Sequence, residues 1–120
     1  MKALIIDDEI DICYLLSALL INRKIEVEYV NSIADAVLAL EMHKPEIIFL
    51  DNHLPDGMGV DFAAYIKKLN PAAKVAMITA YDTAADRKIA LAGGIDYFIG
   101  KPFNRDKIYQ IVDNMLTLSA

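Results

Sequence analysis

Acidic residues stand in this sequence at the points where two buried strands would end. Asp7 and Asp8 come directly after the apolar residues 3–6, and Asp51 comes directly after residues 47–50. A carboxylate is a competent nucleophile toward activated phosphorus and a preferred ligand of hard divalent cations. These residue types therefore indicate phosphoryl or metal chemistry, provided that the fold brings them together.

Two further polar residues follow later apolar runs. Thr79 comes after residues 75–78, and Lys101 comes shortly after residues 95–99 and directly before Pro102. In parallel sheets, ligands bind beyond the carboxyl ends of the strands. If all these runs are parallel strands, the acidic residues, the hydroxyl and the ammonium lie at one edge of one sheet.

Three carboxylates in one crevice repel one another, and the single positive charge of Lys101 does not balance them. A divalent ion bound by oxygen ligands resolves this conflict, and Mg²⁺ suits a site that keeps some of its waters. We expect Asp8 and Asp51 to be direct ligands and Asp7 to bind through water. The backbone carbonyl of His53 is expected to be a further ligand.

Each of these residues also has an ordinary structural explanation. Asp8 would serve as the N-cap of a first helix, Asp51 as a turn cap, Thr79 as a loop hydroxyl and Lys101 as a surface lysine. Taken singly, these explanations are the better ones. Taken together, their coincidence at one predicted sheet edge favours a functional site.

The elements that must position these residues follow from periodicity. Five short apolar runs, residues 3–6, 25–30, 47–50, 75–78 and 95–99, alternate with segments of helical spacing, of which the fourth is the least clear. Strict alternation predicts an α/β fold, a five-stranded parallel sheet with helices on both faces. Gly93 and Gly94 are expected to end the fourth helix, and Asn104 to cap the fifth.

Length and composition limit the remaining possibilities. The 120 residues allow one domain, assigned here to 1–120, and 56% of them are hydrophobic. One cysteine, Cys13, permits no internal disulfide, which favours a cytoplasmic protein. No segment is long enough to span a membrane. The net charge of −5 makes direct binding to nucleic acid a poor hypothesis.

The ordered motifs resemble the receiver domains of two-component response regulators. The resemblance rests on LIIDDE at 4–9, IIFLD at 47–51, LPDGM at 54–58, MITA at 77–80, AGGIDYFI at 92–99 and KPF at 101–103. It covers nearly the whole chain and implies the flavodoxin-like three-layer sandwich with strand order 2-1-3-4-5. Any single motif is weak, whereas the ordered set with its spacings is specific.

The resemblance also implies roles at the site. Asp51 corresponds to the phosphoryl acceptor, and Asp7 and Asp8 correspond to residues that hold Mg²⁺. Lys101 corresponds to the lysine that pairs with the phosphoryl group, and the peptide bond to Pro102 is expected to be cis. The domain is then a signalling switch that assists its own phosphorylation and dephosphorylation, not an enzyme.

A conformational switch is implied as well. Thr79 corresponds to the hydroxyl that moves to the phosphoryl group, and Phe98 to the aromatic residue that rotates into the vacated space. Phe98 lacks the hydroxyl of the commoner tyrosine, so its inward state gains no hydrogen bond. His53 and Tyr81 lie two residues after the acceptor and after Thr79, where bulky rings are expected to shield the phosphate and lengthen its lifetime. A solvated loop imidazole remains the alternative for His53.

The resemblance implies a phosphohistidine donor on a sensor histidine kinase or a histidine phosphotransfer protein. The output partner stays open, because the chain could be a stand-alone monomer, a weak dimer or the receiver of a longer regulator. Two other functions compete. A haloacid dehalogenase-type phosphatase also uses a strand-end aspartate, but it needs a second aspartate where His53 stands. A degenerate receiver would serve only as a protein-interaction module.

Overall fold

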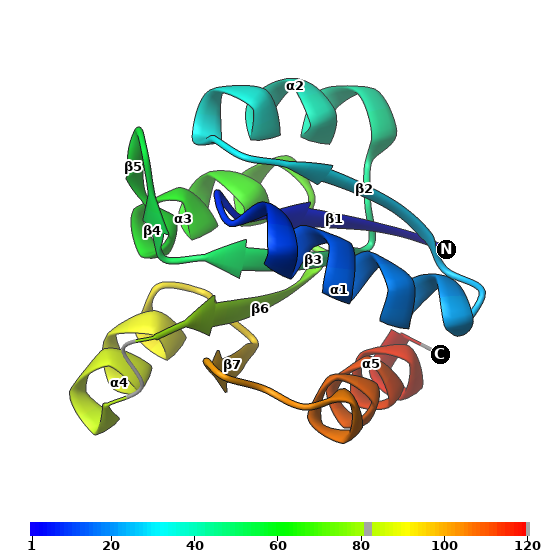
Figure 1. The fold of residues 1–120 in the computed structure, drawn as a ribbon. Coiled ribbons are helices and arrows are strands. Elements are labelled where there is room, and N and C mark those ends of the chain that lie inside the picture. Colours follow the sequence, from blue (N-terminus) through cyan, green and yellow to red (C-terminus); the bar gives the residue numbers. More distant parts are fainter. Residues whose placement is uncertain (81–82, 120) are drawn as a thin grey trace.

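The computed structural model describes residues 1–80 and 83–119. Strands and helices alternate through the described residues, except that β3, β4 and β5 follow one another before α3 (Figure 1). Their bounds are β1 Lys2–Ile6, α1 Ile10–Asn22, β2 Glu26–Val30, α2 Ile33–His43, β3 Ile47–Asp51, β4 His53–Leu54, β5 Gly57–Met58, α3 Gly59–Leu69, β6 Lys74–Thr79, α4 Ala84–Ala92, β7 Tyr97–Gly100 and α5 Arg105–Ser119.

Five of the strands form one parallel sheet in the order β2-β1-β3-β6-β7. Counted by the strands of this sheet alone, the order is 2-1-3-4-5, so the predicted fold is confirmed. The two short strands β4 and β5 pair antiparallel in a separate hairpin, which periodicity did not predict. No helix within the described residues is long and apolar enough to cross a membrane.

The sheet is covered on both faces because its side chains alternate between two apolar clusters. Helices α2, α3 and α4 pack over one face, where β1 contributes Leu4 and Ile6 and β3 contributes Ile48 and Leu50. Helices α1 and α5 pack over the other face against the intervening residues, such as Phe49. This burial on both sides explains why the central strands β1, β3 and β6 read as continuous apolar runs, whereas β2 at the sheet edge alternates with exposed glutamates.

The helix boundaries have identifiable causes. Asn104 accepts a hydrogen bond from the Lys107 amide at 2.8 Å, which confirms its predicted role at the start of α5. At the end of α4, Gly94 has a φ of +98°, whereas Gly93 is at −83°. The positive φ that ends this segment therefore belongs to Gly94 alone.

The β4–β5 hairpin is tied to the start of α2. The Asp56 carboxylate, in the turn of the hairpin, accepts hydrogen bonds from the amides of Ile33 and Ala34 at 2.8 and 3.0 Å. These two bonds lower the pKa of Asp56 below its ordinary value of 3.8. Since amides at a helix N-terminus lack partners within the helix, Asp56 caps α2 from outside it.

Asp56→Ala is expected to lower the melting temperature at pH 7 by a few degrees, because two helix amides lose their acceptor. The folded-state pKa is lowered, so this stabilisation is present above the ordinary pKa and is lost as pH falls through the lower folded value. Thermal denaturation at pH 7 and at pH 2 measures both effects. Asp35→Ala is the matched control, since Asp35 also lies in the first turn of α2. An Asp56 effect no larger than the Asp35 effect would refute this account.

Candidate functional site

The acidic residues of the sequence do meet at one edge of the sheet. Asp7 follows β1, and Asp51 and Thr79 are the last residues of β3 and β6. Asp7, Asp8 and Asp51 each offer a carboxylate oxygen, and these oxygens lie within 4.8 Å of one another. The carboxyl ends of neighbouring parallel strands thus produce the cluster that the sequence predicted.

Asp7 is fixed from several sides and is 1% exposed. Its Oδ1 accepts the Glu9 amide at 2.9 Å, and its backbone carbonyl accepts Nδ2 of Asn31 at 2.8 Å. Asp8 is exposed, and the N-cap residue of α1 is Glu9. The simple alternative for Asp8, a helix cap, is therefore wrong, and its carboxylate is available to a ligand.

Lys101 enters the cluster from the loop after β7. Its Nζ lies 3.2 Å from Asp7 Oδ2, 3.2 Å from Glu9 Oε1 and 3.7 Å from Asp51 Oδ1. The Lys101 side chain is 11% exposed, so its pairs with the buried carboxylates of Asp7 and Asp51 are poorly screened by water. The peptide bond between Lys101 and Pro102 is cis, as the resemblance implies.

The electrostatics of the cluster favour an added cation. Burial, and next the charge of Asp7, raises the pKa of Asp51 to about 7, although Lys101 opposes this. Burial likewise raises the pKa of Asp7. Asp7 Oδ2 is buried and accepts no hydrogen bond from the described residues, despite its ion pair with Lys101. An oxygen-rich donor set with a buried, incompletely satisfied oxygen fits a hard divalent ion such as Mg²⁺.

The backbone after Asp51 is held by the start of α3. The Gly59 amide donates to the Asn52 carbonyl at 2.8 Å, and the Val60 amide donates to Asn52 Oδ1 at 3.0 Å. A Cβ at Gly59 would lie 2.3 Å from the Asp51 carbonyl oxygen. Only glycine permits this close approach, which fixes the end of β3 and with it the Asp51 side chain.

Thr79 and Phe98 face a common cavity under α4. The cavity measures about 150 Å³, and Met58, Met77 and Ile89 also line it. Phe98 is half-buried, and the Arg87 guanidinium lies 5.2 Å from the centre of its ring. Space beside both residues is what a rearrangement of the hydroxyl and the ring requires.

His53 is exposed, and its amide bonds to the Asp51 carboxylate, which partly offsets the rise in the Asp51 pKa. The backbone of His53 therefore lies beside the acidic cluster. Tyr81, for which the sequence predicts a similar shielding role, lies outside the described residues.

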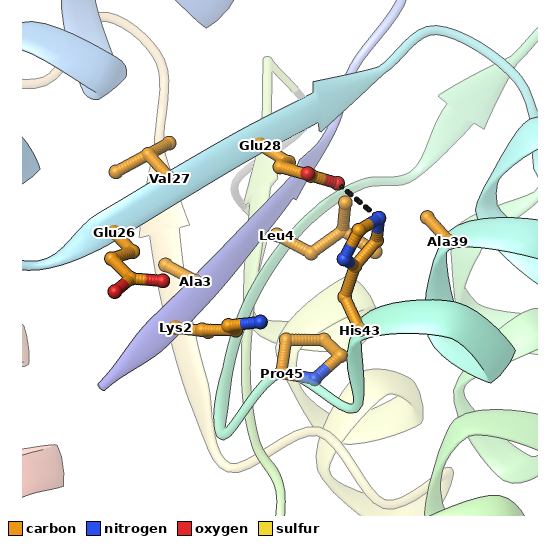
Figure 2. Close-up of a pocket in the computed structure, with 9 residues that line it drawn as sticks. All are labelled: Lys2, Ala3, Leu4, Glu26, Val27, Glu28, Ala39, His43 and Pro45. Atoms are coloured by element: carbon orange, nitrogen blue, oxygen red, sulfur yellow. Dashed lines mark ion pairs between the residues drawn. The ribbon is translucent and has the colours of Figure 1, made fainter.

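A second cavity lies at the opposite edge of the sheet, near the starts of β1 and β2 (Figure 2). It measures about 130 Å³, and His43 reaches across it to Glu28 with 2.9 Å between Nε2 and Oε2. Lys2 and Glu26 also line it. Within the described residues, His43 and Glu28 form an ion pair in this cavity, and the cavity holds none of the residues of the acidic cluster.

The sequence did not single out three residues that support the site. Asn31 fixes the Asp7 carbonyl, Gly59 allows α3 to approach Asp51, and Glu9 pairs with Lys101. All three depend on contacts between distant segments and leave no local pattern.

Comparison with known protein families gives one match over most of the chain. The sequence profile described as the response regulator receiver domain matches residues 3–113. Response regulator protein PilR of Pseudomonas aeruginosa is 35% identical over 117 residues, which are 98% of this chain and 26% of PilR. Sensory transduction protein LytT of Bacillus anthracis is 33% identical, over 92% of this chain and 45% of LytT. The chain thus spans a quarter to a half of the length of these relatives.

Solved structures agree with the sequence relatives. A two-component response regulator from Clostridium difficile superposes with a TM-score of 0.93 at 26% identity, covering 98% of this chain and 96% of that one. The beryllofluoride-activated NtrC4 receiver domain dimer gives 0.93 at 26% identity, over 99% and 98% of the two chains. In both cases the similarity covers nearly the whole of each chain.

Proposed function

Since this chain belongs to the response regulator receiver domain family, a family of two-component signalling, we propose that Asp51 is its phosphoryl acceptor. The observation that carries this proposal is the convergence of Asp7, Asp8 and Asp51 within 4.8 Å, with Lys101 beside them. Asp51 is the last residue of a central, fully buried strand, so its carboxylate points into a fixed environment.

The reaction is a transfer of one phosphoryl group. A carboxylate oxygen of Asp51 attacks phosphorus, and the bond from phosphorus to the donor nitrogen breaks with the electron pair staying on nitrogen. The donor ring, protonated at its other nitrogen, leaves as neutral imidazole. The product is an acyl phosphate. Negative charge on the phosphoryl oxygens must be neutralised in the transition state, and this matters more for the rate than covalent catalysis does. Lys101, already 3.7 Å from Asp51, supplies one positive charge.

Asp8 and Asp51 would bind Mg²⁺ directly, Asp7 would do so through water, and the His53 carbonyl is proposed as a further ligand. When bound, the ion would offset the charge of the transferred oxygens. The chain's own residues hold the geometry: Asp7 stays fixed by the Glu9 amide, and the Asp51 backbone stays fixed by α3.

A switch between two packings is the proposed consequence. The phosphoryl group attracts the Thr79 hydroxyl, and Phe98 turns into the cavity that they share. Because a phenyl ring gains no hydrogen bond there, the two states are expected to differ less sharply than with tyrosine. The surface of α4 and β7 then changes for an output partner.

The proposed donor is phosphohistidine on a sensor kinase or a phosphotransfer protein. Beside the acidic cluster, α1 presents Ile10 and Tyr14, which are 41% and 58% exposed. Exposed apolar side chains next to a reactive site suit the docking of a protein donor. The output partner is proposed to be a separate protein or a further domain.

The experiment that tests this function separates a receiver from a phosphatase. The protein is incubated with acetyl phosphate and Mg²⁺, and bound phosphoryl groups are counted by intact mass. We expect labelling to stop at one equivalent, with no turnover of p-nitrophenyl phosphate. Continuous turnover of that ester would favour the haloacid dehalogenase-type reaction, and absence of labelling would favour a degenerate receiver.

His53→Ala and Tyr81→Ala are each expected to shorten the lifetime of the acyl phosphate severalfold, because a bulky ring no longer shields it from water. Hydrolysis of the labelled protein is followed after removal of acetyl phosphate. His43→Ala is the control, because His43 lies at the opposite edge of the sheet and pairs with Glu28. Unchanged hydrolysis in both ring variants would leave His53 as a solvated loop side chain.

A further inference from the structure

The Lys101 ammonium is shared among three carboxylates and lies farthest from the proposed acceptor. It is 3.2 Å from both Asp7 and Glu9, but 3.7 Å from Asp51. Asp7 is needed at the base of the cluster, where its other oxygen is fixed by a backbone amide. Glu9, by contrast, reaches Lys101 from the rim, where its side chain is 58% exposed.

The backbone of Glu9 is fixed by hydrogen bonds, while its side chain does not cap the helix. Its amide donates to Asp7 Oδ1, and its carbonyl accepts the amides of Ile12 and Cys13 at 3.1 and 3.2 Å. Glu9 is the N-cap residue of α1, yet its side chain makes no capping bond. The carboxylate is directed instead to Lys101, across 92 residues of sequence.

We propose that Glu9 is a positioning residue that holds the Lys101 ammonium away from Asp51 until the acceptor is phosphorylated. This inference rests on the proposed function of Asp51. A phosphoryl group brings a charge of about −2 and three acceptor oxygens. The ammonium then moves to the phosphoryl oxygens, and its contact with Glu9 is lost. Glu9 therefore stabilises the unmodified state.

The direction of the effect follows from this competition. Without the Glu9 contact, Lys101 is free to approach Asp51 before the reaction, and the phosphorylated state no longer loses an ion pair. Partly exposed ion pairs contribute little, so Glu9→Gln is expected to speed labelling by acetyl phosphate about two- to fivefold. Affinity for beryllofluoride, a phosphoryl mimic, is expected to rise by the same factor.

Two other variants distinguish the specific contact between Glu9 and Lys101 from the general electrostatic effect of a nearby negative charge. Asp11→Asn removes one charge two residues away, on the exposed first turn of α1. Glu9→Asp keeps the charge but shortens the side chain by one methylene, which withdraws it from Lys101. Aspartate is also a favoured N-cap residue, so this variant should fold at least as well as the wild type.

The test compares labelling rates of the wild type and these three variants at saturating Mg²⁺. We expect Glu9→Gln and Glu9→Asp both to exceed Asp11→Asn, with Glu9→Asp faster than the wild type. If Glu9→Gln only matches Asp11→Asn, or if Glu9→Asp matches the wild type, the contact has no positioning role and the inference is wrong.

A spectroscopic measurement keeps this result distinct from a failure of the proposed function. The Lys101 ammonium signal in nitrogen-resolved NMR is expected to shift on Glu9→Gln in the unmodified protein and to stay unchanged in the beryllofluoride-bound form. A wild type that is never labelled would overturn the role of Asp51. An unmoved Lys101 signal in the unmodified protein would overturn the role of Glu9.

Discussion

Asp51→Asn is expected to abolish phosphoryl labelling while making the Mg²⁺-free protein more stable than the wild type at pH 8. An amide cannot form the acyl phosphate, so labelling by acetyl phosphate should fall to background. The same substitution removes a buried carboxylate that ionises only against the cost of burial and the charge of Asp7. If one variant loses the reaction and gains stability, Asp51 is both the reactive residue and a carboxylate whose ionised form destabilises the folded state.

The pH dependence follows from the shift of the Asp51 pKa from 3.8 to about 7. A carboxyl group with a raised folded-state pKa contributes stability fully below its unfolded pKa, and this contribution is lost as pH rises through the folded value. The stability difference between Asp51→Asn and the wild type should therefore grow from pH 4 to pH 8. A shift of this size corresponds to a few kcal/mol. Denaturant titrations at both pH values measure it.

Addition of Mg²⁺ should reduce the stability difference between Asp51→Asn and the wild type. Binding to the folded state alone stabilises by about 2.7 kcal/mol at a hundredfold excess over Kd. The wild type keeps all three carboxylates, so its melting temperature should rise with Mg²⁺ more than that of Asp51→Asn. Asp96→Asn would be a poor control because Asp96 bonds to Lys67 and the Val75 amide. Asp11→Asn is a suitable control for the loss of one carboxylate, because Asp11 lies in the exposed first turn of α1. Equal Mg²⁺ shifts in both Asp51 forms would contradict a metal site that includes Asp51.

Gly59→Ala is expected to destabilise the fold by about 1–3 kcal/mol, a typical cost of overpacking. The new Cβ would lie 2.3 Å from the Asp51 carbonyl oxygen and 3.1 Å from the Asn52 Cα, and both belong to backbone. Helix α3 must then retreat, which stretches the bond from the Gly59 amide to the Asn52 carbonyl. Because that retreat moves the end of β3, the labelling rate at Asp51 should fall as well.

Gly93→Ala is the matched control. Its Cβ would meet Val60 Cγ2 at 3.4 Å, an ordinary contact, and its φ of −83° suits alanine. Its effect should stay within about 1 kcal/mol in either direction. Urea denaturation and acetyl phosphate labelling of the two variants give the comparison. If Gly59→Ala unfolds at the same urea concentration as Gly93→Ala, close packing at Asp51 is not what requires glycine.

The sheet and the acidic cluster were predictable because they depend on local patterns. Buried parallel strands read as continuous apolar runs, and a polar residue at the end of such a run must lie at the sheet edge. Asp51 and Thr79 needed no other information. The preference for asparagine at helix N-caps placed Asn104 at the start of α5, where the structure has it as a cap.

What could not be predicted depends on distant segments. The β4–β5 hairpin has strands of two residues, too short for any periodicity, and its link from Asp56 to α2 crosses more than twenty positions. The Lys101–Glu9 contact joins the two ends of the chain. Glycine at position 59 carries no signal of its own, since its φ is not positive and the need for it arises only from the Asp51 carbonyl.

The most direct test of the account is to locate the phosphoryl group chemically. The protein is labelled with acetyl phosphate and Mg²⁺, the acyl phosphate is reduced with borohydride, and the peptide that spans residues 47–58 is sequenced by mass spectrometry. We expect homoserine at position 51 of the wild type, and none when a chelator removes Mg²⁺. Labelling at another residue, or labelling at Asp51 that persists without the metal, would contradict the central claim.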